Sequence, residues 1–196
     1  MTSPPKPELL IVDDEAHVLS ALHRVLHWHF SNRVTVTSTT APTEALRWVA
    51  ERPFAAVLSD LRMPKVDGLR LLARVAELQP HAALLLLTGV ADFSAAQRAV
   101  NHVGVFRYLT KPWQDDDLAA HLSAALAHSE ALHQRAAHAD AWACEHGQLS
   151  PQDAERRRLE AIEPGITCVE WGPQGEVLMP PLEAAMAAKP GRHTPH

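Results

Sequence analysis

The stretch Leu9-Leu10-Ile11-Val12-Asp13-Asp14 decides the fold, because a short apolar run stands directly before two carboxylates. Four consecutive apolar residues, two of them β-branched, indicate a strand that is buried on both faces. Residues 15–28 follow with apolar side chains at helical spacing. A strand followed by a helix is the unit from which parallel sheets are built.

The same unit recurs four more times along the chain. The further predicted strands are residues 34–37, 55–58, 82–87 and 105–109, and the further predicted helices are residues 43–51, 69–78, 92–102 and one that begins at Asp115. Strict alternation of strand and helix predicts an α/β fold with a five-stranded parallel sheet, doubly wound by helices on both faces. Ligands bind such sheets outside the carboxyl ends of the strands.

Polar residues stand at those carboxyl ends. The predicted set comprises Asp13 and Asp14 after the first strand, Asp60 after the third, Thr88 after the fourth and Lys111 after the fifth. Three carboxylates close together repel one another, and Mg²⁺ relieves that repulsion. A carboxylate beside Mg²⁺ can attack phosphorus and form an aspartyl phosphate, while a lysine and a threonine hold the phosphoryl oxygens.

These segments resemble the receiver domains of two-component response regulators over residues 8–128. The matching stretches are residues 11–15, 59–64, 67–68, 87–89 and 108–112. The resemblance implies a flavodoxin-like sheet in the strand order 2-1-3-4-5. It also implies that Asp60 is the phosphoacceptor and that Lys111, held by a cis peptide bond to Pro112, pairs with the phosphoryl group.

The resemblance also assigns the metal and the switch. Asp14 and Asp60 would bind Mg²⁺ directly, Asp13 would act largely through water, and the backbone carbonyl of Arg62 would complete the protein ligands. Thr88 would supply the switch hydroxyl. Tyr108, the single tyrosine of the chain, would be the aromatic residue that changes rotamer on phosphorylation.

The implied partners are a sensor histidine kinase or a histidine phosphotransfer protein as phosphodonor, and a second copy of the chain. Receivers of this kind dimerise through the fourth helix, fifth strand and fifth helix, which correspond here to residues 92–127. The chain is not expected to be a conventional enzyme beyond Mg²⁺-dependent self-phosphorylation from a phosphodonor. The resemblance also implies that the side chain of Val90, two residues after Thr88, borders the path of the water that attacks the aspartyl phosphate. Because Val90 offers no group to orient that water, we expect slow hydrolysis of the aspartyl phosphate.

Composition narrows the classes of protein. The 196 residues are 46% hydrophobic and 21% charged with a net charge of −5, which excludes wholesale disorder and gives no general surface for nucleic acid. The sequence shows neither a membrane-spanning apolar run nor a signal peptide. Two cysteines make no disulfide framework, so we expect reduced thiols and a cytoplasmic location.

A helical pattern continues from Asp115 to about Gly147. Apolar or small residues recur there at alternating steps of four and three, at Leu118, Leu122, Ala125, Ser129, Leu132, Ala136, Ala139 and Ala143. That spacing is typical of a coiled-coil seam between two chains. Because five of the eight are Ala or Ser, the alternative is a helix that packs on its own domain or lies free. Residues 129–149 are therefore read as a helical extension or coiled coil.

The remaining segments carry no output domain of a known kind. The sequence predicts a helix over residues 150–162 and a β-hairpin over residues 166–179. It also predicts a mostly disordered tail over residues 180–196 and a flexible leader over residues 1–7. The function is predicted to be a phosphorylation-controlled switch of dimerisation or partner contacts. Two alternatives stay open: a module that only shuttles phosphate, and a transcriptional regulator that acts through the tail.

Overall fold

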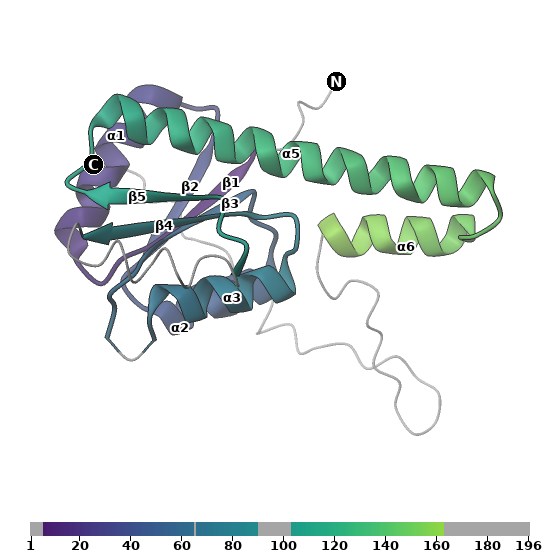
Figure 1. The fold of residues 1–196 in the computed structure, drawn as a ribbon, viewed down its shortest axis with the longest axis horizontal. Coiled ribbons are helices and arrows are strands. Elements are labelled where there is room, and N and C mark those ends of the chain that lie inside the picture. The colour runs from purple at the N-terminus through teal and green to yellow at the C-terminus, as the bar shows by residue number, and fades with distance from the viewer. Residues whose placement is uncertain (1–5, 65, 90–102, 163–196) are drawn as a thin grey trace, which may run out of the picture.

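The computed structural model describes residues 6–64, 66–89 and 103–162. Strands and helices alternate through the described chain (Figure 1). In chain order they are β1 (Glu8–Val12), α1 (Ala16–Phe30), β2 (Thr35–Thr39), α2 (Pro42–Glu51), β3 (Ala56–Asp60), α3 (Gly68–Leu78), β4 (Ala83–Gly89), β5 (Arg107–Lys111), α5 (Asp115–Glu145) and α6 (Pro151–Ile162).

The strands form one parallel sheet of five in the order β2-β1-β3-β4-β5. This is the predicted order, and β1 and β3 stand at its centre. Alternate residues of β1 pack on opposite faces, as the two-residue period of a strand requires. Leu9 and Ile11 belong to the core beneath α1 and α5, whereas Leu10 and Val12 belong to the core beneath α2 and α3. Figure 1 shows α5 on one face of the sheet and α2 and α3 on the other.

Four strands end two residues later than predicted. They are β2 at Thr39, β3 at Asp60, β4 at Gly89 and β5 at Lys111. β5 also begins two residues later than predicted, because Val105 and Phe106 pack against the core before the strand begins. The shift makes Lys111 the last residue of β5, where it is paired in register with Gly89 of β4.

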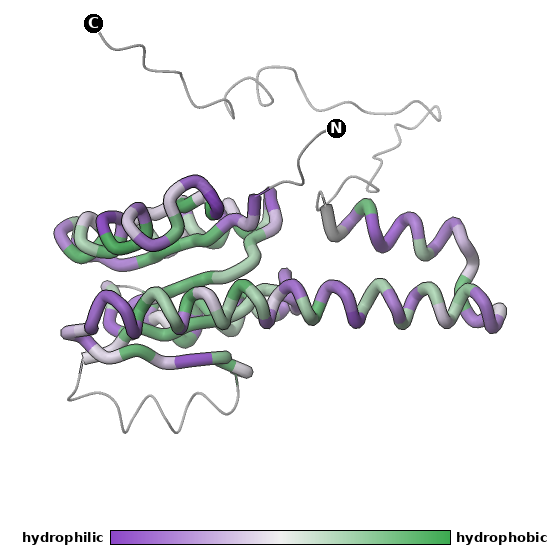
Figure 2. The backbone as a smooth tube through the Cα atoms, turned by 90° about the horizontal axis from the view of Figure 1, so that it is seen from above, coloured by the Kyte–Doolittle hydropathy of each residue, from purple (hydrophilic) through white to green (hydrophobic). Residues whose placement is uncertain are grey.

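The helix α5 extends far beyond the sheet. Its buried residues, Leu118, Ala119, Leu122, Ala125 and Ser129, all lie in its first half. The second half projects past the sheet, and α6 returns alongside it (Figures 1 and 2). The predicted boundary at residue 128 therefore falls inside a continuous helix.

The first half of the predicted coiled-coil seam is wrong as a contact between chains. Leu118, Leu122 and Ala125 are fully buried in the core beneath α5. A second chain could reach them only if the domain came apart. The alternative interpretation, packing on the chain's own domain, holds for this half of the helix.

Some predicted elements lie outside the described residues. They are the helix at residues 92–102, the β-hairpin at residues 166–179 and the tail at residues 180–196. The helix predicted at residues 150–162 is present as α6.

Candidate functional site

Three predicted site residues meet at the carboxyl edge of the sheet. Asp13 follows β1, Asp60 ends β3, and Lys111 ends β5. The Lys111 Nζ atom lies 2.7 Å from Asp13 Oδ2 and 2.6 Å from Asp60 Oδ1. Both carboxylates are buried, with 1% of Asp13 and 6% of Asp60 exposed. One ammonium group thus bridges two buried carboxylates.

Burial and charge act on this cluster in opposite directions. Burial raises the pKa of Asp60 above its ordinary value, and the ion pair with Lys111 offsets only part of that effect. Burial alone would lower the pKa of Lys111, but its hydrogen bonds to Asp13 and Asp60 outweigh burial and raise that pKa. Lys111 therefore stays a cation near neutral pH.

The backbone around Asp60 fixes the direction of its carboxylate. The Arg62 amide donates to Asp60 Oδ2 at 2.6 Å, and the Leu61 amide donates to the Leu87 carbonyl at 2.8 Å. Oδ2 is thereby engaged by the loop that follows β3, while Oδ1 faces Lys111. The carboxylate is held by groups on two sides.

Gly68 is a structural part of the site that sequence reasoning missed. A Cβ atom added at this glycine would lie 1.9 Å from the backbone oxygen of Asp60. The first residue of α3 therefore packs against the last residue of β3, and only glycine fits there. The Asp67-Gly68 pair was noted in the sequence as part of a motif, but the close approach of two backbones leaves no signal in a sequence.

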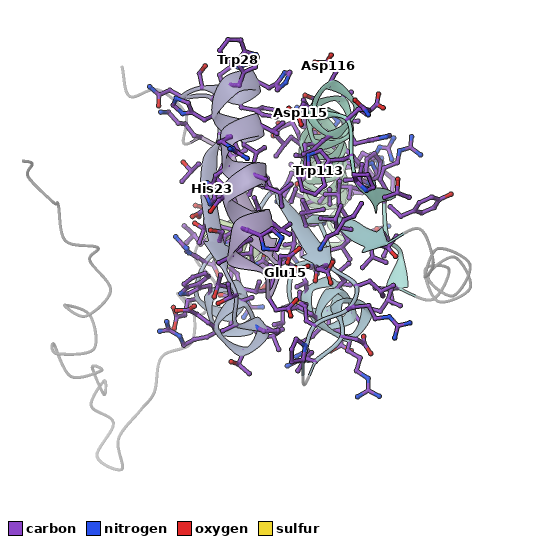
Figure 3. All side chains as sticks on the ribbon, turned by 90° about the vertical axis from the view of Figure 1, so that its left-hand side faces the viewer. Glu15, His23, Trp28, Trp113, Asp115 and Asp116 are labelled. Carbon is purple, nitrogen blue, oxygen red and sulfur yellow. The ribbon has the colours of Figure 1, made fainter. Side chains whose placement is uncertain are left out.

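Asp14 and Glu15 lie beside the cluster and are exposed. The Glu15 amide donates to Asp13 Oδ1 at 2.9 Å, which orients the buried carboxylate. Glu15 Oε1 lies 3.8 Å from Lys111 Nζ, so it adds a third, weaker negative charge near the ammonium group. Figure 3 shows Glu15 at the start of α1.

The two predicted switch residues occupy β4 and β5. Thr88 is fully buried, and its hydroxyl donates to the Gly89 carbonyl at 3.2 Å. Tyr108 is 40% exposed and is paired in register with Leu86. The peptide bond between Lys111 and Pro112 is cis, as predicted. Val90 lies outside the described residues.

The donor types at this edge suit Mg²⁺, which prefers carboxylate and carbonyl oxygens. Asp13, Asp14, Asp60 and the Arg62 carbonyl supply such oxygens. In the present arrangement, however, no three acidic, histidine or cysteine side chains among the described residues are close enough to hold a metal ion. Lys111 pairs with Asp13 and Asp60 instead, so a bound cation would share these carboxylates with the ammonium group.

The family model described as "Response regulator receiver domain" matches residues 9–123. The hydrogenase transcriptional regulatory protein HoxA of Bradyrhizobium diazoefficiens is 34% identical over 110 residues, which are 56% of this chain and 22% of that protein. The chain thus spans about a fifth of the length of HoxA. The transcriptional regulatory protein FixJ of the same organism is 30% identical over 162 residues, which are 83% of this chain and 76% of FixJ.

Two solved structures are similar to this chain over most of its length. The signal receiver domain of an HD domain-containing protein from Pseudomonas fluorescens Pf-5 is 33% identical, with a TM-score of 0.63 over 69% of this chain and 97% of that one. Full-length FixJ from B. japonicum is 25% identical, with a TM-score of 0.59 over 81% of this chain and 89% of that one. Among the described residues, no helix combines the length and apolar character needed to cross a bilayer.

Proposed function

The chain belongs to the response regulator receiver domain family, and from this membership we propose that Asp60 accepts a phosphoryl group and thereby switches the protein's contacts. The observation that carries the proposal is the buried cluster of Asp13, Asp60 and Lys111 at the carboxyl edge of the sheet. Burying charged groups costs free energy by desolvation, and clusters of buried titratable groups with shifted pKa values concentrate at functional sites.

The proposed reaction is a phosphoryl transfer from a histidine on a sensor kinase or a phosphotransfer protein. A carboxylate oxygen of Asp60 attacks phosphorus, a P–O bond forms, and the P–N bond to the donor imidazole breaks. The departing imidazole takes up a proton. Lys111 pairs with one phosphoryl oxygen as a point charge, and its raised pKa keeps it charged for that purpose.

Mg²⁺ is the proposed cofactor, and it would neutralise phosphoryl oxygens during the transfer. Asp14 and Asp60 are proposed as direct ligands together with the carbonyl oxygen of Arg62, and Asp13 as a ligand that acts through water. Asp13 is buried, its Oδ2 atom pairs with Lys111, and its Oδ1 atom accepts a hydrogen bond from the Glu15 amide. These contacts are compatible with such an indirect role.

The proposed switch starts with the added charge, about −1.5 to −2 at pH 7. The Thr88 hydroxyl, bonded now to the Gly89 carbonyl, would turn to a phosphoryl oxygen, and Tyr108 would change its rotamer. The output is a change in dimerisation or in partner contacts. If the output is dimerisation, we expect the two chains to contact each other through residues 92–102, β5 and the exposed side of α5.

Binding of a phosphoryl analogue tests this function without a kinase. Beryllofluoride with Mg²⁺ is expected to shift the NMR signals of Thr88 and Tyr108 in the wild-type chain and not in Asp60→Asn. Asp116→Asn is the matched control, because Asp116 is an almost fully exposed carboxylate of α5 that contacts only His29 in the described chain. Unmoved Thr88 and Tyr108 signals in the wild-type chain would contradict the proposal.

Transcriptional regulation is a second candidate function. It is favoured by the similarity to FixJ, which extends over 162 residues and thus beyond the 9–123 match of the receiver model. The basic run of α6 does not favour DNA binding, since Arg156, Arg157 and Arg158 all pair with carboxylates. Salt-dependent binding of the phosphorylated chain to DNA would support this candidate, and its absence would remove the DNA-binding form.

A further inference from the structure

The projecting half of α5 presents one face to α6. Half-buried residues recur along it at Ala136, Asp140 and Ala143, at steps of four and three that keep them on one side of a helix. Asp140 of this set forms an ion pair with Arg157 of α6, with Nη1 and Oδ1 3.0 Å apart. Ala136 and Ala143 belong to the second half of the seam that the sequence predicts, whereas Ala139 of that seam is exposed and Leu132 lines a cavity with residues of the receiver.

The reversal that brings α6 back is built into the sequence. Gly147 adopts φ 68°, and the Gln148 amide donates back to the Ala143 carbonyl at 2.8 Å, which ends α5. Ser150 then caps α6, because its hydroxyl accepts from the Asp153 amide at 3.1 Å. The far end of α6 reaches the receiver, where Arg157 and Glu160 line a cavity of about 270 Å³ together with Phe54 and His81.

Only one of three neighbouring arginines holds α6 to α5. Arg156, Arg157 and Arg158 have nearly equal side-chain exposures of 64%, 63% and 64%. Arg156 pairs with Asp153 and Arg158 with Glu155, both within α6, whereas Arg157 alone reaches across to α5. Exposed ion pairs are weak, so this contact can be exchanged for another.

The sequence of α5 supplies the competing partner. With Ala136 at a core position of a heptad, Arg135 falls at position g and Asp140 at position e. In a parallel pair of helices, position g of one chain meets position e of the other five residues further on. Arg135 is exposed and forms no ion pair with any residue in the described ranges. Asp140 can thus be bound by Arg157 of its own chain or by Arg135 of a second copy.

We propose that residues 135–143 of α5 form a self-association surface for a second copy of this chain, and that α6, which pairs with Asp140, covers part of this surface as its intramolecular competitor. The inference deepens the dimerisation part of the proposed function and does not depend on phosphorylation of Asp60. It is tested on the unphosphorylated full chain without Mg²⁺, so its failure would leave phosphoryl acceptance standing.

Sedimentation equilibrium over a range of concentrations measures the dimer dissociation constant. Arg157→Ala is expected to lower that constant by about two- to fivefold, the worth of an exposed ion pair. Arg156→Ala, equally exposed and paired only within α6, is expected to leave it unchanged. Adding Arg135→Ala to Arg157→Ala is expected to reverse the gain. Equal constants for Arg157→Ala and Arg156→Ala, or no dimer in any variant, would overturn the proposal.

Cross-linking locates the contact. In a background with Cys144 and Cys168 replaced by serine, Ala136→Cys is expected to form a disulfide between chains faster when Arg157→Ala is also present. Ala137→Cys, one position away on an exposed side of α5, is the control and is expected to react slowly in both backgrounds. Equal rates at residues 136 and 137 would overturn the proposal, because the dimer would then use another face.

Discussion

Lys111 is the residue on which the candidate site depends, because its ammonium group pairs with two buried carboxylates. Both Asp13 and Asp60 lie at the ends of strands whose apolar residues are fully buried, so their positions follow from the strand pattern. The sequence could predict which residues meet at this edge. It could not predict that Asp13 is buried and Asp14 exposed, since the two are adjacent and chemically identical.

Gly68 gives a prediction at this scale. Gly68→Ala is expected to destabilise the chain by about 1–3 kcal/mol, because the new methyl group would overlap the Asp60 backbone and one of the two segments must move. Urea denaturation measures the change. Gly89→Ala, beside Thr88 but with no atom of the described residues other than its chain neighbours within 4 Å of the added Cβ, is the control and should cost much less. An equal loss of stability in the two variants would contradict the close approach of the Gly68 and Asp60 backbones.

We expect the free energy of unfolding to depend on pH through His81, which lies outside the acidic cluster. Its ring lies 4.9 Å from that of His133, and burial, followed by the proximity of His133, lowers the pKa of His81. Arg157 and Glu160 face the same cavity. A lowered histidine pKa means that the unfolded chain binds the proton more readily, so stability is lost as the pH falls below about 6.5. His81→Gln should flatten the stability profile between pH 5 and 7, and an unchanged slope would refute this cause.

At the scale of elements, the two halves of α5 differ in burial, because all of its buried residues lie in the first half. Leu122 is fully buried in the core between α5 and the sheet, whereas Leu132 is only half-buried and lines a cavity with Phe106 and His128. Leu122→Ala is expected to lower the free energy of unfolding by about 2–5 kcal/mol, and Leu132→Ala by about 1 kcal/mol. Chemical denaturation of both variants compares the two halves. Similar losses would mean that the projecting half is as much a part of the core as the first.

Element boundaries show where prediction from the sequence succeeds and where it stops. The ranges of α2, α3 and α6 follow closely from apolar spacing and from Pro42, Asp67 and Ser150 near their starts. β5 begins two residues later than the sequence predicts, because Val105 and Phe106 are apolar residues typical of strands. The seam of α5 was ambiguous for a physical reason: a spacing of four and three fits a partner helix and the chain's own sheet equally well.

At the scale of the whole molecule, the receiver and the extension present different problems. The described part of the receiver could be predicted closely, because four of its five strands lead to a residue with defined chemistry and the parallel order brings those ends to one edge. The extension could not, because whether Asp140 and its neighbours in α5 contact α6 or a second chain depends on the balance of weak contacts. Local residues such as Gly147 and Ser150 mark the turn but not what the returning helix meets.

The measurement that tests the central claim most directly is the intact mass of the chain after incubation with a phosphorylated histidine donor and Mg²⁺. The wild-type chain is expected to gain one phosphoryl group, and Asp60→Asn is expected to gain none. Asp116→Asn, the exposed control, should gain one as the wild type does. A phosphoryl group that persists in Asp60→Asn, or its absence from the wild-type chain, would contradict the assignment of Asp60 as the phosphoacceptor.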